Sequence, residues 1–122
     1  MPDKKKRILV VDDDALVRDV LSRHLEIRGF DTVCVGDAPG AFEKITSDVF
    51  DAILLDNSLP GMMGITALPR IVDMTKAPVI LITGYPNEET YKDALLLGAK
   101  AFMAKPIDPD ELAAQINGLI AK

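Results

Sequence analysis

The sequence is short of residues that build disulfides and zinc sites: its 122 residues include one cysteine, one histidine and no tryptophan. A single cysteine cannot form an intrachain disulfide, so a reducing compartment is the natural setting. Cys34 lies in an alternating apolar stretch and is expected to be buried as a small hydrophobe. His24 lies on or beside the apolar stripe of its helix and is assigned no role, because no second ligand lies near it in sequence.

Long hydrophobic runs and an excess of positive charge are also missing. No apolar run reaches about 18 residues, which argues against a membrane-spanning helix, and the first residues lack the order of a secretion signal. The net charge is −5, and the one basic run, Lys4–Arg7, precedes the first expected strand, which argues against direct nucleic-acid binding. These absences predict a cytoplasmic domain that acts neither in a membrane nor directly on nucleic acid.

What is present is an ordinary globular composition, 48% hydrophobic and 27% charged, at a length that suits one domain. Short apolar runs alternate with amphipathic helical patterns in five strand–helix repeats, which predicts a parallel sheet covered by helices on both faces. A doubly wound sheet and a small closed barrel both fit, although five units are too few for the eight-stranded barrel. Residues 1–122 are expected to form one α/β domain, with strands over Arg7–Asp12, Asp31–Val35, Phe50–Leu55, Ala77–Thr83 and Lys100–Ala104.

The segment after the third strand contains a local conflict. The loop Asn57–Gly64 holds Pro60-Gly61, a turn pair, and its last glycine is expected to let the chain bend back. A helix is predicted from about residue 65 to 74, and it includes Pro69. That proline is tolerable only if the helix starts late enough to leave it in the first turn.

The helix that starts after Asn87 has more leucine than one buried stripe needs. Tyr91 and Leu95 fit the stripe, which leaves Leu96 or Leu97 facing outward. A broad buried face and a partner surface explain this run equally well.

Polar side chains end or follow four of the expected strands: Asp12 and Asp13, Asp56, Thr83 and Lys105. Because the carboxyl ends of parallel strands share one edge of the sheet, we expect these side chains to meet. Three carboxylates favour a hard, partly hydrated cation such as Mg²⁺. A nucleophilic carboxylate can accept a phosphoryl group, whose charge the metal, the lysine and the hydroxyl would offset.

Five motifs carry a family resemblance: VVDDD at 10–14, ILLD at 53–56, LPG at 59–61, ITG at 82–84 and AKP at 104–106. In order and spacing they resemble the CheY-like receiver domains of response regulators in bacterial two-component signalling, over essentially the whole chain. The resemblance implies a flavodoxin-like (βα)5 doubly wound fold with strand order 2-1-3-4-5. It also implies a cis peptide bond before Pro106.

The resemblance further implies that Asp56 is phosphorylated by a partner histidine kinase or phosphotransfer protein in a Mg²⁺-dependent reaction. Mg²⁺ would be bound by Asp13, by Asp56 and by the backbone carbonyl of Ser58, with Asp12 acting mainly through water. Thr83 would bind the phosphoryl group and Lys105 would pair with it. Beyond its own phosphorylation and dephosphorylation, the domain is not expected to be an enzyme.

Phe102 falls at the family's aromatic switch position, where tyrosine is frequent. A swap of its ring would couple Thr83 to the surface of the fourth helix, fifth strand and fifth helix, which could control an output domain or partner, or form a homodimer. Asn57, Ser58 and Tyr85 occupy positions that modulate phosphate loss in this family, so we expect an altered rate, with its direction open.

Two other functions compete with this switch. The first is a Mg²⁺-dependent phosphatase with an aspartyl nucleophile; similar enzymes carry a second Asp two residues after the nucleophile, where this chain has Ser58. The second is a receiver-like scaffold that works without phosphate, which the complete set of acidic, hydroxyl and lysine residues disfavours. The kinase, the output and the oligomeric state stay open.

Overall fold

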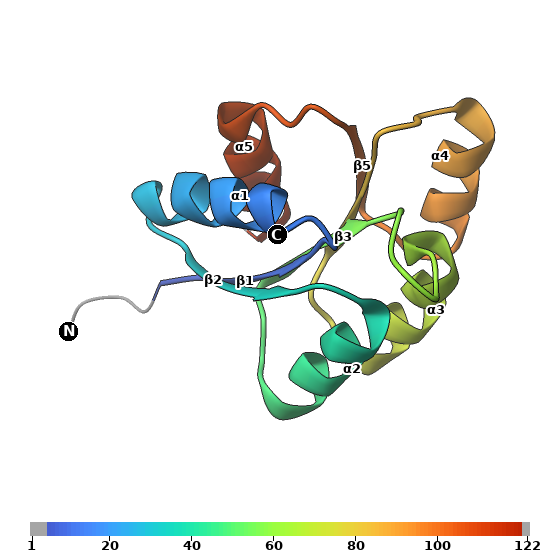
Figure 1. The fold of residues 1–122 in the computed structure, drawn as a ribbon, viewed down its shortest axis with the longest axis horizontal. Helices are drawn as coiled ribbons and strands as arrows, with labels where there is room; N and C mark the ends of the chain where they lie inside the picture. The colour runs from blue at the N-terminus through green and yellow to red at the C-terminus, as the bar shows by residue number, and fades with distance from the viewer. Residues whose placement is uncertain (1–4, 121–122) are drawn as a thin grey trace.

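The computed structural model describes residues 5–120, so Lys4 of the basic run lies outside it. Five parallel strands form one sheet in the order β2-β1-β3-β4-β5 (Figure 1). This confirms the flavodoxin-like doubly wound sheet and excludes a closed barrel. The strands are β1 Arg7–Val11, β2 Asp31–Val35, β3 Ala52–Asp56, β4 Val79–Thr83 and β5 Ala101–Ala104.

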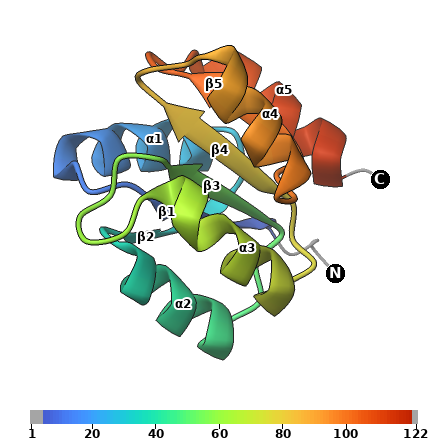
Figure 2. The ribbon, with the colours of Figure 1, turned by 90° about the vertical axis from the view of Figure 1, so that its right-hand side faces the viewer.

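Five helices cover the two faces of this sheet (Figures 1 and 2). They are α1 Ala15–Ile27, α2 Ala38–Ser47, α3 Gly64–Met74, α4 Glu88–Leu96 and α5 Pro109–Ile120. Buried residues of α1 and α5 pack against one face, and those of α2, α3 and α4 pack against the other. No helix within residues 5–120 is long and apolar enough to cross a membrane.

The interior strands β1, β3 and β4 are buried along their length except for the partly exposed Arg7 at the start of β1, as their aliphatic sequences predict. Every residue of β3 and β4 is buried, whereas the edge strand β2 has no buried residue. Cys34 lies on β2 opposite Val10 and is exposed. The prediction that Cys34 is buried was therefore wrong, because β2 is paired with another strand on one side only.

The helix α3 also corrects a prediction. It begins at Gly64, so Pro69 lies inside the helix rather than in its first turn. Pro69 is exposed, and its neighbour Leu68 is buried. Gly61 has a positive φ of 77°. Gly64, the last glycine of the loop, lies where the chain returns against the end of β3, because a Cβ there would fall 2.3 Å from the carbonyl oxygen of Asp56.

The helix α4 is the least covered of the five. Its only buried residue is Ala94. Tyr91 and Leu95, which were expected on a buried stripe, are 46% and 40% exposed. Leu96 is 84% and Leu97 is 38% exposed, so a broad buried face does not explain the leucine run.

Candidate functional site

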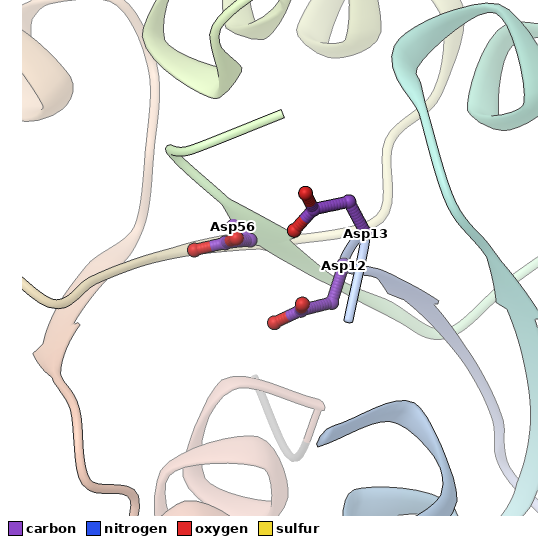
Figure 3. Close-up of side chains that lie close together, drawn as sticks. All are labelled: Asp12, Asp13 and Asp56. Atoms are coloured by element: carbon purple, nitrogen blue, oxygen red, sulfur yellow. The ribbon is translucent and has the colours of Figure 1, made fainter. Parts of the chain in front are cut away.

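The carboxyl ends of β1, β3, β4 and β5 bring the expected side chains to one edge of the sheet. Asp12 and Asp13 follow β1, while Asp56 and Thr83 are the last residues of β3 and β4. Lys105 follows β5 directly. Figure 3 shows the carboxylates of Asp12, Asp13 and Asp56 gathered at this edge and turned toward the same side.

Lys105 joins two of these carboxylates. Its Nζ lies 3.1 Å from Asp12 Oδ2 and 3.3 Å from Asp56 Oδ1. Asp12 and Asp56 are 2% and 3% exposed, so both charges are removed from water. Such a pair of buried carboxylates is tolerated only when hydrogen bonds and opposite charge compensate it.

At Asp56, hydrogen bonds and opposite charge do not fully compensate the burial of the carboxylate. Burial, followed by the charge of Asp12, raises the pKa of Asp56, and the Lys105 ammonium and the Ser58 backbone N–H offset only part of this rise. Burial alone would lower the pKa of Lys105, but its hydrogen bond and charge interaction with Asp12, and then Asp56, raise it overall. Two buried carboxylates face this single ammonium, so the site carries an excess of negative charge when both are ionised.

That excess, together with the donor set, fits a divalent cation. Asp12, Asp13 and Asp56 each offer one carboxylate oxygen, and these atoms lie within 4.8 Å of one another. Three carboxylates beside one ammonium leave two negative charges uncompensated when all are ionised. Oxygen-only donors of this charge suit Mg²⁺ or Ca²⁺ rather than Zn²⁺.

Backbone contacts hold Asp12 in place. Its N–H donates to the carbonyl oxygen of Val35 at 3.1 Å, and its own carbonyl oxygen accepts from Arg18 Nη1 at 2.7 Å. Its Oδ1 accepts the N–H of Asp14 at 2.9 Å, while the Asp14 side chain caps α1. Capping thus accounts for one of the three consecutive aspartates and leaves the other two for the site.

Of the remaining expected residues, Thr83 and Ser58 lie near Asp56 in the fold, and Phe102 lies within β5. Thr83 is 2% exposed, and its Oγ1 accepts the N–H of Tyr85 at 3.0 Å. Ser58 is exposed beside Asp56. Phe102 is half-buried on β5, where its ring meets that of Tyr91 edge to face, with 5.5 Å between centroids and 85° between planes. The Lys105–Pro106 bond is cis, as the resemblance implied.

Three contacts that position the site were missed from the sequence. Arg18 anchors the Asp12 carbonyl, and Asn57 and Gly64 fix the start of α3 against the end of β3. The hydrogen-bonded partners are only six and eight residues apart in the chain, but each contact forms only after the segment between them has turned back. The two glycines of the loop were the nearest hint.

Comparisons with known proteins agree with this geometry. The family model described as the response regulator receiver domain matches residues 8–117. The transcriptional regulatory protein CrdR of Helicobacter pylori is 33% identical over 115 residues, which is 93% of this chain and 54% of that protein. The regulatory protein AtoC of Escherichia coli is 40% identical over 107 residues, 87% of this chain and 23% of that protein. The chain thus spans about half, or less, of the curated relatives it matches.

Solved structures show the same fold. A CheY-like receiver domain protein from Methanospirillum hungatei has a TM-score of 0.92 and 31% identity, covering 97% of this chain and 95% of that one. A response regulator from Burkholderia pseudomallei, solved with a phosphorylated aspartic acid, calcium and citrate, has a TM-score of 0.89 and 25% identity, covering 96% and 69%. By its sequence, its fold and its acidic edge, the chain belongs to the receiver domains of two-component response regulators.

Proposed function

We propose that residues 1–122 form a single receiver domain in which Asp56 accepts a phosphoryl group from a histidine kinase or phosphotransfer protein. The observation that carries this proposal is the placement of Lys105 between the buried carboxylates of Asp12 and Asp56. A lysine at this place can pair with the Asp56 carboxylate and, after phosphorylation, with the oxygens of the phosphoryl group on Asp56. The domain's own chemistry is limited to gaining and losing that group.

In the transfer, an oxygen of Asp56 attacks the phosphorus of a phosphohistidine. The bond from phosphorus to imidazole nitrogen breaks, the imidazole leaves with the electron pair, and an acyl phosphate remains on Asp56. Lys105 offsets the charge of the phosphoryl oxygens. The Thr83 hydroxyl already accepts the N–H of Tyr85, so its own proton is available for a phosphoryl oxygen.

Asp13, Asp56 and the Ser58 carbonyl would hold Mg²⁺, with Asp12 acting through water. When bound, the cation supplies positive charge that reduces repulsion between Asp56 and the incoming phosphoryl group. The clustered, under-compensated carboxylates support this role.

A phosphodonor protein must cover the sheet edge to reach Asp56. Beside Lys105 and Gly84 lies a groove of about 530 Å³, and helix α1 lines its far wall. Leu16 on that wall is 70% exposed. An apolar wall next to the acceptor suits a helix of the donor protein.

The response would travel through Thr83 and Phe102 to the surface of α4, β5 and α5. A change in the Phe102 ring alters its contact with Tyr91 of α4. This surface would control an output domain or partner protein, and the exposed leucines of α4 make it a candidate homodimer interface. CrdR is a transcriptional regulatory protein of about twice this length, so any DNA binding would belong to an output domain.

Incubation with Mg²⁺ and acetyl phosphate, followed by intact-mass measurement, tests the proposal. We expect a single phosphoryl adduct on the wild type and on Asp93→Asn, a control on the exposed face of α4. Asp56→Asn should form none. A wild type without an adduct, or an equal adduct on Asp56→Asn, would sink the proposal.

A further inference from the structure

One residue, Asn57, makes the hydrogen bonds that hold the loop between β3 and α3 in its closed conformation. Its Oδ1 accepts the N–H of Ile65 at 2.8 Å. Its carbonyl oxygen accepts the N–H of Gly64 at 2.9 Å and of Leu59 at 3.2 Å. Its own N–H donates to Ile82 of β4 at 2.8 Å. The residue next to Asp56 therefore ties loop, helix and sheet together.

These bonds replace a cap that α3 lacks. The N-cap residue, Met63, makes no side-chain hydrogen bond. The first four N–H groups of a helix need partners from outside it, and Asn57 supplies partners for the first two from across the loop. By contrast, α4 is capped locally by Asn87, whose Oδ1 accepts the N–H of Thr90 at 2.8 Å.

The start of α3 also lies directly against the acceptor segment. A Cβ at Gly64 would fall 2.3 Å from the carbonyl oxygen of Asp56 and 2.9 Å from the Cα of Asn57. Ser58, the next residue, acts on Asp56 in turn, because its backbone N–H lowers the pKa of the Asp56 carboxyl. A shift of α3 away from Asn57 would therefore disturb Asp56 and Ser58 as well.

We propose that Asn57 is a positioning residue for the cation site, which holds the loop closed so that Asp56 and the Ser58 carbonyl are pre-arranged for Mg²⁺. Asn57 itself does not bind the ion. This inference rests on the proposed function, because it takes Asp56 and Ser58 as ligands. Residues that orient metal ligands typically account for about tenfold or more in metal affinity.

Calorimetric titration of the whole chain with MgCl₂ tests this role in Asn57→Ala and Asn87→Ala. The two variants lose the same kind of bond, an asparagine Oδ1 accepting a helix N–H at 2.8 Å. We expect Mg²⁺ affinity to fall about tenfold in Asn57→Ala and to stay unchanged in Asn87→Ala. Unchanged affinity in the first variant, or an equal loss in both, would overturn the inference.

A measurement on the wild type does not depend on the folding of any variant. If closure of the loop raises the affinity for Mg²⁺ by some factor, then bound Mg²⁺ must raise the equilibrium constant for loop closure by the same factor. Saturating Mg²⁺ should slow amide hydrogen exchange at Gly64 and Ile65 about fivefold or more and leave Thr90 unchanged. Amide exchange rates at Gly64 and Ile65 that are the same with and without Mg²⁺ would rule the inference out.

The two proposals fail differently. A wild type that binds no Mg²⁺ and gains no phosphoryl adduct overturns the proposed function and this inference with it. A wild type that does both, while Asn57→Ala binds Mg²⁺ normally, overturns only the role of Asn57.

Discussion

Helices α3 and α4 follow neighbouring strands and pack on the same face of the sheet, yet they are held very differently. Four residues of α3 are buried, against one of α4. The loop before α3 is hydrogen-bonded at both ends through Asn57, whereas residues 84–87 before α4 are all exposed. One side of the site is therefore fixed, and the other can move at little cost in buried contacts.

This division suits a switch. The fixed side carries Asp56 and its loop, where precise placement of ligands matters. The loose side begins at Thr83, whose hydroxyl accepts the N–H of Tyr85. A phosphoryl group that accepts a hydrogen bond from the Thr83 hydroxyl would shift a segment that few other contacts hold in place. Helix α4 would shift with it through the contact between Tyr91 and Phe102.

The largest difference between the two sides is expected from matched glycine substitutions. Gly64→Ala places a methyl group 2.3 Å from the Asp56 carbonyl oxygen, while the same atom at Gly84 meets nothing within 4 Å. We expect Gly64→Ala to lower the free energy of unfolding by about 3 kcal/mol. Gly84→Ala should change it by less than about 0.5 kcal/mol. Urea unfolding curves measure both values. Similar losses of unfolding free energy in the two variants would show that the two loops are equally constrained.

A smaller effect of opposite sign is expected at the acceptor. Burial and the charge of Asp12 raise the pKa of Asp56, so the ionised form is disfavoured in the folded chain. Asp56→Asn keeps the shape and removes that charge, and Lys105 keeps its contact with Asp12 at 3.1 Å. In EDTA at neutral pH, we expect the free energy of unfolding to rise by about 1 kcal/mol, while Asp93→Asn on α4 leaves it unchanged.

The pH dependence of this gain has a definite sign. A carboxyl whose pKa is raised by folding binds its proton more tightly in the folded chain than in the unfolded one. Its destabilising effect is full above the folded pKa of Asp56 and disappears as the pH falls below the unfolded value, near 3.8. The advantage of Asp56→Asn in urea unfolding should therefore shrink on acidification. An advantage that grows as the pH falls would show that the buried charge of Asp56 is not its cause.

Sequence reasoning succeeded where the pattern is repeated along the chain. Five apolar runs predicted five strands, and the parallel arrangement then predicted that Asp12, Asp56, Thr83 and Lys105 would meet at one edge. The rule that strand ends converge needs no knowledge of side-chain contacts. Strand order came from the family resemblance, because hydrophobic periodicity does not encode which strands are neighbours.

The predictions that were wrong or absent share a physical reason. Cys34 and Leu95 have apolar neighbours at the correct period, but Cys34 lies on edge strand β2, and α4, which carries Leu95, buries only Ala94. Periodicity shows which way a side chain points, but not whether anything covers it. The contact of Asn57 with Ile65 was missed because it forms only when the loop between them closes.

The smallest effect on stability, and the sharpest test of the loose side, is expected at Leu96. This side chain is 84% exposed on α4, so Leu96→Lys should change the free energy of unfolding by less than about 0.5 kcal/mol. If the leucines of α4 form a homodimer interface, light scattering with a beryllofluoride phosphate mimic should show a wild-type dimer and a Leu96→Lys monomer. Ile27→Lys, at a 79% exposed position on α1, should remain dimeric. A wild type that stays monomeric with and without the mimic would leave α4 free for a different partner, whereas loss of the dimer in both variants would reflect added charge rather than the surface of α4.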